Sequence, residues 1–278
     1  MVNPETRAVY ARAVTTAAHV RNAAIQAAFA AVPRERFLGP PPWQVVSDFG
    51  TVRATDDPAL LYSDLLVAID RARGINNGEP QLWALVFDRL ALAEGMRVLH
   101  VGAGTGYYTA ILAELVGPSG SVTALEVEAD LAARAQDALA AWPQVTVMAK
   151  DASELTDLPF DRIVFSCGVT GLPGPWLEGL TPGARIAVPL TGVDHAGIFL
   201  LLIRQEAGFE VVPLCGVSIY PAAGFRRPQE ERQLDGVRRA DREALWSARS
   251  LRHVAGTEPA ERIYGFGGHV LSMQPLAR

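Results

Sequence analysis

The chain has 278 residues, of which 49% are hydrophobic and 20% charged, and its formal net charge is −5. This composition can build a sizeable core and excludes long-range disorder. It contains no basic stripe, so we expect no nucleic-acid partner.

The cysteines and the apolar runs indicate in which cellular compartment the protein is expected. Cys167 and Cys215 are too few for a disulfide scaffold or a zinc site, and the histidines show no metal-binding spacing. The first residues lack the charged-then-apolar layout of a secretion signal. The longest apolar run, 198–203, is too short to span a bilayer. We therefore expect a cytoplasmic protein that binds no metal and no membrane.

The N-terminal part predicts helices followed by irregular chain. Residues 5–31 are rich in alanine, carry an apolar stripe and predict one or two helices. The prolines at 40–42 forbid a helix there. Residues 43–80 read as irregular chain with short extended pieces at 60–62 and 65–69.

Short apolar strands and helices alternate from residue 80 onward. The expected strands are 97–101, 121–126, 145–149, 162–167 and 184–189. The expected helices are 80–92, 107–115, 128–141 and a short one around 176–180. This alternation predicts a parallel sheet with right-handed crossovers. Two closing strands, 197–204 and 210–220, would form a hairpin and make the sheet mixed, and the remaining tail predicts a charged helix at 230–249 and a strand at 269–273.

The most informative stretch is Val98-Leu-His-Val-Gly102-Ala-Gly104-Thr-Gly106-Tyr-Tyr108, where a strand ends, three glycines alternate and a helix begins. Glycine lets the backbone turn sharply and approach a ligand, and a helix start offers free N–H groups. A dinucleotide fingerprint places its third glycine one residue later, where the helix start receives a pyrophosphate. The pattern here is instead typical of S-adenosylmethionine sites. Nicotinamide or flavin binding and a purely structural turn are the alternatives.

Polar residues follow the next strands at the edge where open α/β sheets bind ligands. Glu126 could accept bonds from both ribose hydroxyls, and Asp151 could take the adenine amino group or simply cap a helix. His100 could contact the cofactor or pack in the core. The candidate cofactor-binding residues are His100, Gly102, Ala103, Gly104, Gly106, Tyr107, Glu126, Val127, Asp151, Ala152 and Ser166.

Together these segments resemble the protein-L-isoaspartate O-methyltransferase family, within the class I S-adenosylmethionine-dependent methyltransferases. The likeness covers roughly residues 20–220, and its matching stretches are 32–37, 62–64, 74–80, 98–107 and 182–189. The glycine loop identifies only the superfamily. The segment Val32-Pro-Arg-Glu-Arg-Phe37 is the one that points to this family.

The resemblance implies an α/β fold with a doubly wound, seven-stranded mixed sheet of the Rossmann-like methyltransferase type. It implies S-adenosyl-L-methionine as cofactor and esterification of a carboxylate, such as L-isoaspartyl in a protein or peptide. The expected parts are an N-terminal helical cap with the substrate loop (1–80), the S-adenosylmethionine-binding domain (81–228) and a C-terminal extension (229–278).

One loop departs from the family, which usually carries Thr-Ile-Ser-Gln before the proline, where this chain has Asn76-Asn77-Gly78-Glu79. The family's serine falls on Gly78. From this alignment Asn76, Asn77 and Gly78 are the candidate catalytic residues, the amides donating hydrogen bonds and the Gly78 N–H binding the acceptor oxygen. Arg73 could hold a substrate carboxylate or stay solvated. The alternative functions are methylation of a small molecule and a catalytically inactive, cofactor-binding interaction protein.

Overall fold

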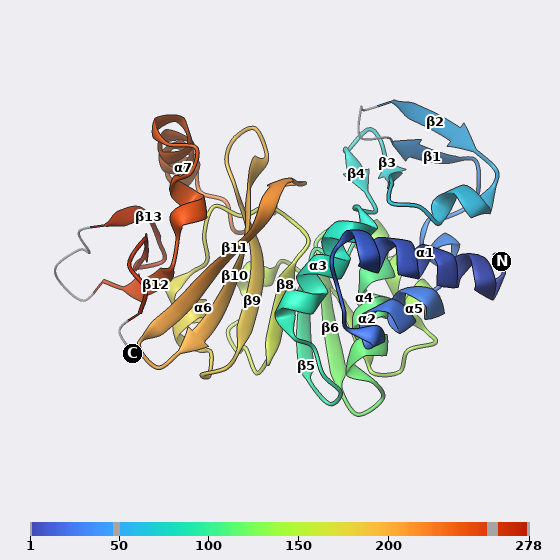
Figure 1. Ribbon diagram of the computed structural model, residues 1–278, viewed down its shortest axis with the longest axis horizontal. Helices are drawn as coiled ribbons and strands as arrows, with labels where there is room; N and C mark the ends of the chain where they lie inside the picture. Colours follow the sequence, from blue (N-terminus) through green and yellow to red (C-terminus); the bar gives the residue numbers. More distant parts are fainter. Residues whose placement is uncertain (1, 47–50, 255–260, 277–278) are drawn as a thin grey trace. The chain divides into compact units, whose positions relative to one another are not determined.

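The computed structural model describes residues 2–46, 51–254 and 261–276. It divides into two compact units, which are described separately (Figure 1). Unit 1 consists of residues 1–97 and 103–149, and unit 2 of residues 98–102 and 150–278. Within the described ranges, no helix combines the length and the apolar character that a membrane crossing requires.

The helices of unit 1 follow the sequence prediction closely. The first two are capped by asparagine side chains, Asn3 accepting from the Thr6 N–H and Asn22 from the Ala24 N–H. Pro80 occupies the first turn of the third helix, as expected. The helices are α1 (Pro4–Ala17), α2 (Ala23–Ala31), α3 (Pro80–Leu90), α4 (Tyr107–Val116) and α5 (Ala129–Leu139).

Unit 1 also contains a small antiparallel sheet that the sequence did not reveal. Its order is β2 (Val52–Thr55), β1 (Trp43–Val46), β3 (Leu66–Asp70) and β4 (Ile75–Asn76). Figure 1 shows these four strands together above α1. The extended piece expected at 65–69 is confirmed as β3, whereas the one expected at 60–62 is wrong. Asp57 caps a 3-10 helix there, η2 (Pro58–Leu61), by accepting from the Ala59 N–H.

The glycine loop of unit 1 lies against two parallel strands and a helix. Strands β6 (Ser121–Glu126) and β7 (Val145–Ala149) pair in parallel, with Glu126 opposite Ala149 at their ends. A Cβ on Gly106 would lie 2.7 Å from Leu139 Cδ1 of α5. Gly106 therefore lets α4 begin in direct contact with α5, at a φ of +94° that disfavours any other residue.

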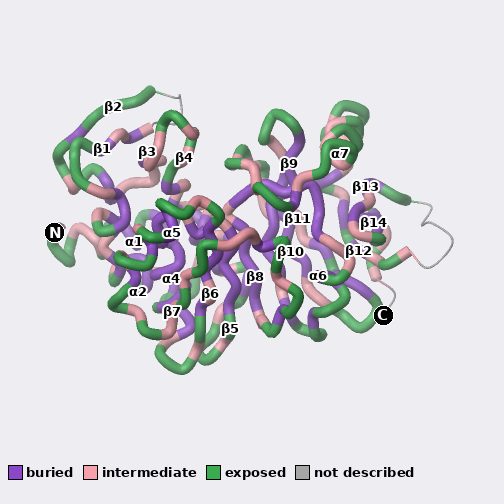
Figure 2. The backbone as a smooth tube through the Cα atoms, turned by 180° about the vertical axis from the view of Figure 1, so that it is seen from behind, coloured by how far each residue is buried: buried purple, intermediate pink, exposed green. Residues whose placement is uncertain are grey.

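The described residues of unit 2 form eight strands, in the order β13 (Arg262–Phe266), β14 (His269–Ser272), β12 (Ser250–His253), β11, β10, β9, β8 and β5. The parallel strands are β5 (Arg97–Val101), β8 (Arg162–Phe165) and β9 (Arg185–Thr191). The hairpin of β10 (Ala196–Gln205) and β11 (Gly208–Ser218) then continues antiparallel, as expected. Figure 2 shows the buried backbone running along β8, β9 and β10. A short helix, α6 (Gly174–Glu178), follows β8.

The tail enlarges the sheet beyond the seven predicted strands. All seven are present as β5 to β11, and the tail adds β12 (Ser250–His253), β13 (Arg262–Phe266) and β14 (His269–Ser272). The helix expected at 230–249 is too long. Helix α7 (Pro228–Ala240) ends at Asp241, and a 3-10 turn, η4 (Ala244–Ser247), leads into β12. The domain boundaries expected at 80 and 228 do not coincide with the two units and stay predictions.

Candidate functional site

In unit 1 the glycine loop is tied to the end of β6. The Gly104 N–H donates to Glu126 Oε2 at 2.7 Å, and the Ala103 N–H donates to the Leu125 carbonyl at 3.0 Å. The other carboxylate oxygen of Glu126 accepts from the Glu128 N–H at 3.0 Å. Two backbone donors thus fix the Glu126 carboxylate beside the loop, as the sequence spacing suggested.

The surroundings of this carboxylate fit a hydroxyl-bearing ligand. A Cβ on Gly104 would meet nothing within 4 Å, so a ligand has room to approach the backbone there. The neighbouring Thr105 hydroxyl is buried and, within the described part of the chain, has no hydrogen-bond partner. Each carboxylate oxygen of Glu126 can accept a second bond. Burial raises the pKa of Glu126, although the backbone donors of Glu128 and Gly104 oppose that shift.

The predicted acceptor loop is held from within. The Gly78 N–H donates to Asn76 Oδ1 at 2.8 Å, and the Asn77 N–H donates to the Val67 carbonyl at 2.8 Å. Asn77 is buried, whereas Asn76 is exposed. The expected role of the Gly78 N–H in binding an acceptor oxygen stays a prediction, and it requires the bond to Asn76 to open.

Restoring the family serine by Gly78→Ser should destabilise the protein by about 2–3 kcal/mol rather than improve it. Gly78 has a φ of +61°, and a Cβ there would lie 2.5 Å from Trp83 Nε1. A left-handed conformation alone costs a non-glycine residue about 1–2 kcal/mol. Gly74→Ser is the matched control, because Gly74 has a φ of +72° with nothing within 4 Å. Urea unfolding should rank Gly78→Ser below Gly74→Ser, and equal stabilities would remove the clash from the explanation.

The residue that organises the loop is Arg34, for which sequence reasoning assigned no role. Its side chain is 0% exposed and makes five hydrogen bonds. The acceptors are Asn77 Oδ1 and the carbonyls of Leu61, Ser63, Leu65 and Gly78. Arg34 lies in the segment 32–37 that carries the family resemblance, and that was the available signal.

Two buried tyrosines begin α4, and one of them contacts the same loop. Tyr108 donates its hydroxyl to the Gly78 carbonyl at 3.1 Å. Tyr107 is 1% exposed, and its hydroxyl is hydrogen-bonded to that of Tyr10 at 3.0 Å. Burial raises the pKa of both phenols well above the ordinary range. The Tyr107 side chain is therefore a core residue, and any contact with a cofactor would have to come from its backbone.

Arg73 is half-buried, and its guanidinium already pairs with carboxylates of this chain. Its guanidinium pairs with Asp70 at 2.8 Å, Glu128 at 2.9 Å and Asp130 at 2.7 Å. These contacts join the turn after β3 to the first turn of α5. Val127, a predicted cofactor contact that precedes Glu128, is 48% exposed.

In unit 2, His100 and Ser166 form a pair at the ends of β5 and β8. His100 Nε2 lies 2.7 Å from Ser166 Oγ, and the ring is 1% exposed. Gly102, with a φ of +76°, passes so close to Cys167 that a Cβ would lie 3.1 Å from its sulfur. The packing alternative for His100 matches this geometry. Its contact with a cofactor stays a prediction.

The protonation of His100 should make stability depend on pH. Burial lowers its pKa to about 3, whereas a histidine in an unfolded chain titrates near 6.5. Between these two pKa values the unfolded state is protonated at His100 and the folded state is not. The contribution of neutral His100 to the free energy of unfolding is therefore complete above about pH 6.5 and is lost as the pH falls toward 3. His100→Gln should flatten the pH dependence of the free energy of unfolding in that window. An unchanged slope in urea titrations would show that another group is responsible.

Asp151 caps the short helix η3 (Ala152–Glu154), which was the alternative reading of this residue. Its Oδ1 accepts from the Ser153 N–H at 2.8 Å, while Glu154 accepts from the Asp151 N–H at 3.3 Å. Ala152 is buried beneath it. A Cβ on Gly224 would lie 2.2 Å from Asp151 Oδ1, so the carboxylate packs against the chain that leads into α7. An adenine contact by Asp151 stays a prediction.

The tail supports the chain that follows β8. Arg226 donates to the Gly168 carbonyl at 3.1 Å and to Thr191 Oγ1 at 2.8 Å. Tyr264, on β13, donates to the Thr170 carbonyl at 2.8 Å. Residues 168–170 are thus held by one side chain that precedes α7 in the sequence and one that follows it.

This chain has an α/β fold in which a glycine loop and an acidic residue lie at the ends of neighbouring elements. That arrangement is typical of open-sheet proteins that bind a nucleoside. Solved structures confirm the fold. The chain is similar to a structure titled protein-L-isoaspartate O-methyltransferase, with a TM-score of 0.67 at 23% identity, covering 84% of this chain and 69% of that one. It is also similar to a putative protein-L-isoaspartate O-methyltransferase from Plasmodium falciparum in complex with S-adenosyl-L-homocysteine. That match has a TM-score of 0.62 at 17% identity and covers 78% of this chain and 98% of the other.

Sequence comparison gives the family. The chain is 34% identical over 163 residues to the protein-L-isoaspartate O-methyltransferase of Methanothrix thermoacetophila, covering 56% of this chain and 76% of the relative. It is 33% identical over 206 residues to protein-L-isoaspartate O-methyltransferase 2 of an Anaeromyxobacter species, covering 73% and 76%. The model of the protein-L-isoaspartate(D-aspartate) O-methyltransferase family matches residues 11–221. The chain belongs to this family.

Proposed function

We propose that the chain is an S-adenosyl-L-methionine-dependent O-methyltransferase that esterifies a carboxylate in a protein or peptide, with L-isoaspartyl as the first candidate. The observation that carries the proposal is the Glu126 carboxylate, fixed by the Gly104 N–H beside an open stretch of backbone. Membership of the family supports the reaction type. A cytoplasmic location belongs to the same proposal and is supported by two free cysteines.

The residues of unit 1 would divide the work of binding and positioning. Glu126 would accept hydrogen bonds from the ribose hydroxyls, and the backbone around Gly104 would pack against the nucleoside. When bound, S-adenosyl-L-methionine supplies a methyl group that its sulfonium already activates. The loop 76–78, anchored by Arg34 and Tyr108, would hold the acceptor in place.

Little acid–base chemistry is required of this chain. A carboxylate acceptor is already ionised at pH 7, so no general base is needed. Holding two reactants in line can lower a barrier by about 7–11 kcal/mol. The internally bonded loop 76–78 fits this role, because it is positioned by contacts that do not involve the acceptor.

The test is methyl transfer from labelled S-adenosyl-L-methionine to an isoaspartyl peptide. Base-labile label should appear on this peptide and not on a matched peptide whose isoaspartyl carboxylate is replaced by an amide. Asn76→Ala, an exposed change, should lower turnover and leave cofactor affinity intact. Cofactor binding with no transfer to any carboxylate would contradict the proposal and favour an interaction protein.

The conformation of Gly78 favours a small-molecule carboxylate as the second candidate acceptor. A side chain at this position would collide with Trp83, so the loop cannot present the serine hydroxyl of the family. Label appearing in a metabolite carboxylate but in no peptide would establish this alternative.

A further inference from the structure

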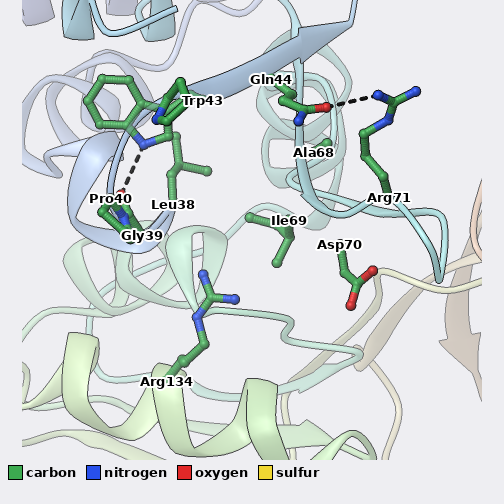
Figure 3. A pocket seen from close by; sticks show the side chains of 11 residues that line it. Leu38, Gly39, Pro40, Trp43, Gln44, Ala68, Ile69, Asp70, Arg71 and Arg134 are labelled. Atoms are coloured by element: carbon green, nitrogen blue, oxygen red, sulfur yellow. Dashed lines mark hydrogen bonds between the residues drawn. The ribbon is translucent and has the colours of Figure 1, made fainter. Parts of the chain in front are cut away.

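A cavity of about 500 Å³ opens in unit 1 beside β3 (Figure 3). Neither Glu126 nor the glycine loop is among the residues that line it. Its apolar wall includes Leu38, Pro40, Trp43 and Ile69. The Trp43 indole N–H donates to the Gly39 carbonyl at 2.9 Å, which closes the turn that forms one side. The Trp43 ring is thus tied to the backbone of the turn at one edge of the cavity.

One guanidinium enters this cavity without a partner. Arg134 rises from α5 toward Leu38 and Ile69 in Figure 3 and is half-buried. Among residues 2–46, 51–254 and 261–276, no hydrogen bond or ion pair involves it. Asp130, one turn earlier on α5, has both carboxylate oxygens taken by Arg73, at 3.0 and 2.7 Å.

The other charged side chains that line the cavity already have hydrogen-bond partners. Asp70 accepts from the Arg73 side chain at 2.8 Å and from its backbone N–H at 3.1 Å. Arg71 donates to Gln44 Oε1 at 3.1 Å on the exposed rim. The unsatisfied group is the Arg134 guanidinium against an apolar wall, and a carboxylate on a short aliphatic stem complements both.

The cavity lies next to the predicted acceptor loop. Ala68, which lines the cavity, pairs with Asn76 across the β3–β4 ladder. Cross-strand neighbours have Cβ atoms about 4.5–5.5 Å apart. An extended peptide advances about 3.3–3.6 Å per residue, so a side chain within a few residues of an acceptor at the loop can reach the cavity.

We propose that this cavity is a subsite for an acidic side chain of the acceptor polypeptide, held by the Arg134 guanidinium. The proposal rests on the proposed function and names the polypeptide it would select: one with Asp or Glu close to the methylated carboxylate. The Arg134 guanidinium lies close to the Gly39 backbone, since a Cβ on Gly39, at its φ of +76°, would be 3.4 Å from Arg134 Nη2.

The experiment uses isoaspartyl peptides of alanine background, with a single Glu moved through the three positions on either side and a Gln peptide for each. In one register the wild-type KM for the Glu peptide should be about tenfold below that of its Gln partner, as expected for one charge-assisted bond. Arg134→Gln should abolish this difference with kcat and the KM of the Gln peptide unchanged. Arg89→Gln, an exposed change on α3, should preserve it.

Peptide affinity is measured in parallel by fluorescence anisotropy with S-adenosyl-L-homocysteine present, so that the subsite is tested even without turnover. Equal KM and affinity for Glu and Gln peptides at every position would overturn the subsite, as would a preference that survives Arg134→Gln. Absence of methyl transfer to all peptides, with a Glu preference in binding that Arg134→Gln removes, would instead overturn the proposed function and retain the subsite.

Discussion

Replacing Arg34 by methionine should lower the free energy of unfolding by about 3–5 kcal/mol, because buried acceptors are left without donors. Four of them are main-chain carbonyls, three in the stretch 61–65 and one at Gly78, and the fifth is Asn77 Oδ1. Arg34→Lys should also destabilise, since an ammonium has three donors and lacks the planar fork. Urea unfolding followed by tryptophan fluorescence measures both.

Arg36→Gln is the control from the same segment. Arg36 is exposed, and its guanidinium lies 5.5 Å from the centre of the Trp142 ring, a contact whose loss costs about 0.5–1 kcal/mol. A denaturation midpoint of Arg34→Met close to that of Arg36→Gln would contradict the organising role of Arg34.

Replacing Glu126 by glutamine should weaken S-adenosyl-L-homocysteine binding by about 100-fold. The glutamine amide has a single acceptor oxygen, and its NH₂ group would face the N–H of either Gly104 or Glu128. Charge-assisted hydrogen bonds are therefore lost both to the backbone and to the ligand. Glu128→Gln is the control, because that carboxylate only pairs with Arg73 at a partly exposed position.

The affinity of the wild type should also fall in acid. Burial raises the pKa of Glu126, and a protonated carboxyl accepts fewer hydrogen bonds than the carboxylate. Binding should therefore weaken as the pH falls toward that raised pKa, and Glu126→Gln should lose this dependence. Calorimetry across the pH range measures it, and equal affinities for the wild type and Glu126→Gln would exclude Glu126 from the cofactor site.

The strands β5 to β11 could be predicted because each contains several apolar residues close together and is bounded by turn residues or helices. Strands β3 and β14 were expected, at 65–69 and 269–273, whereas β1, β2, β4, β12 and β13 could not be predicted. These strands have two to five residues, which is shorter than the windows in which alternation can be recognised. The helix expected to reach 249 stops at Ala240, where Asp241 adopts an extended conformation that the charged composition did not reveal.

The site divides in the same way. The contact between Gly104 and Glu126 follows from a spacing that puts both at the ends of neighbouring elements. The role of Arg34 does not, since four of its five acceptors are main-chain carbonyls, which every residue carries and no pattern marks. Asn76 drew attention as a donor, yet its side-chain oxygen is used to accept from Gly78 within the loop.

The most direct test of the account is calorimetric titration of the intact protein with S-adenosyl-L-homocysteine, NAD⁺ and FAD. Saturable heat is expected with the first ligand, abolished or strongly reduced in Glu126→Gln, and none with the two dinucleotides. Heat with NAD⁺ or FAD and none with S-adenosyl-L-homocysteine would contradict it.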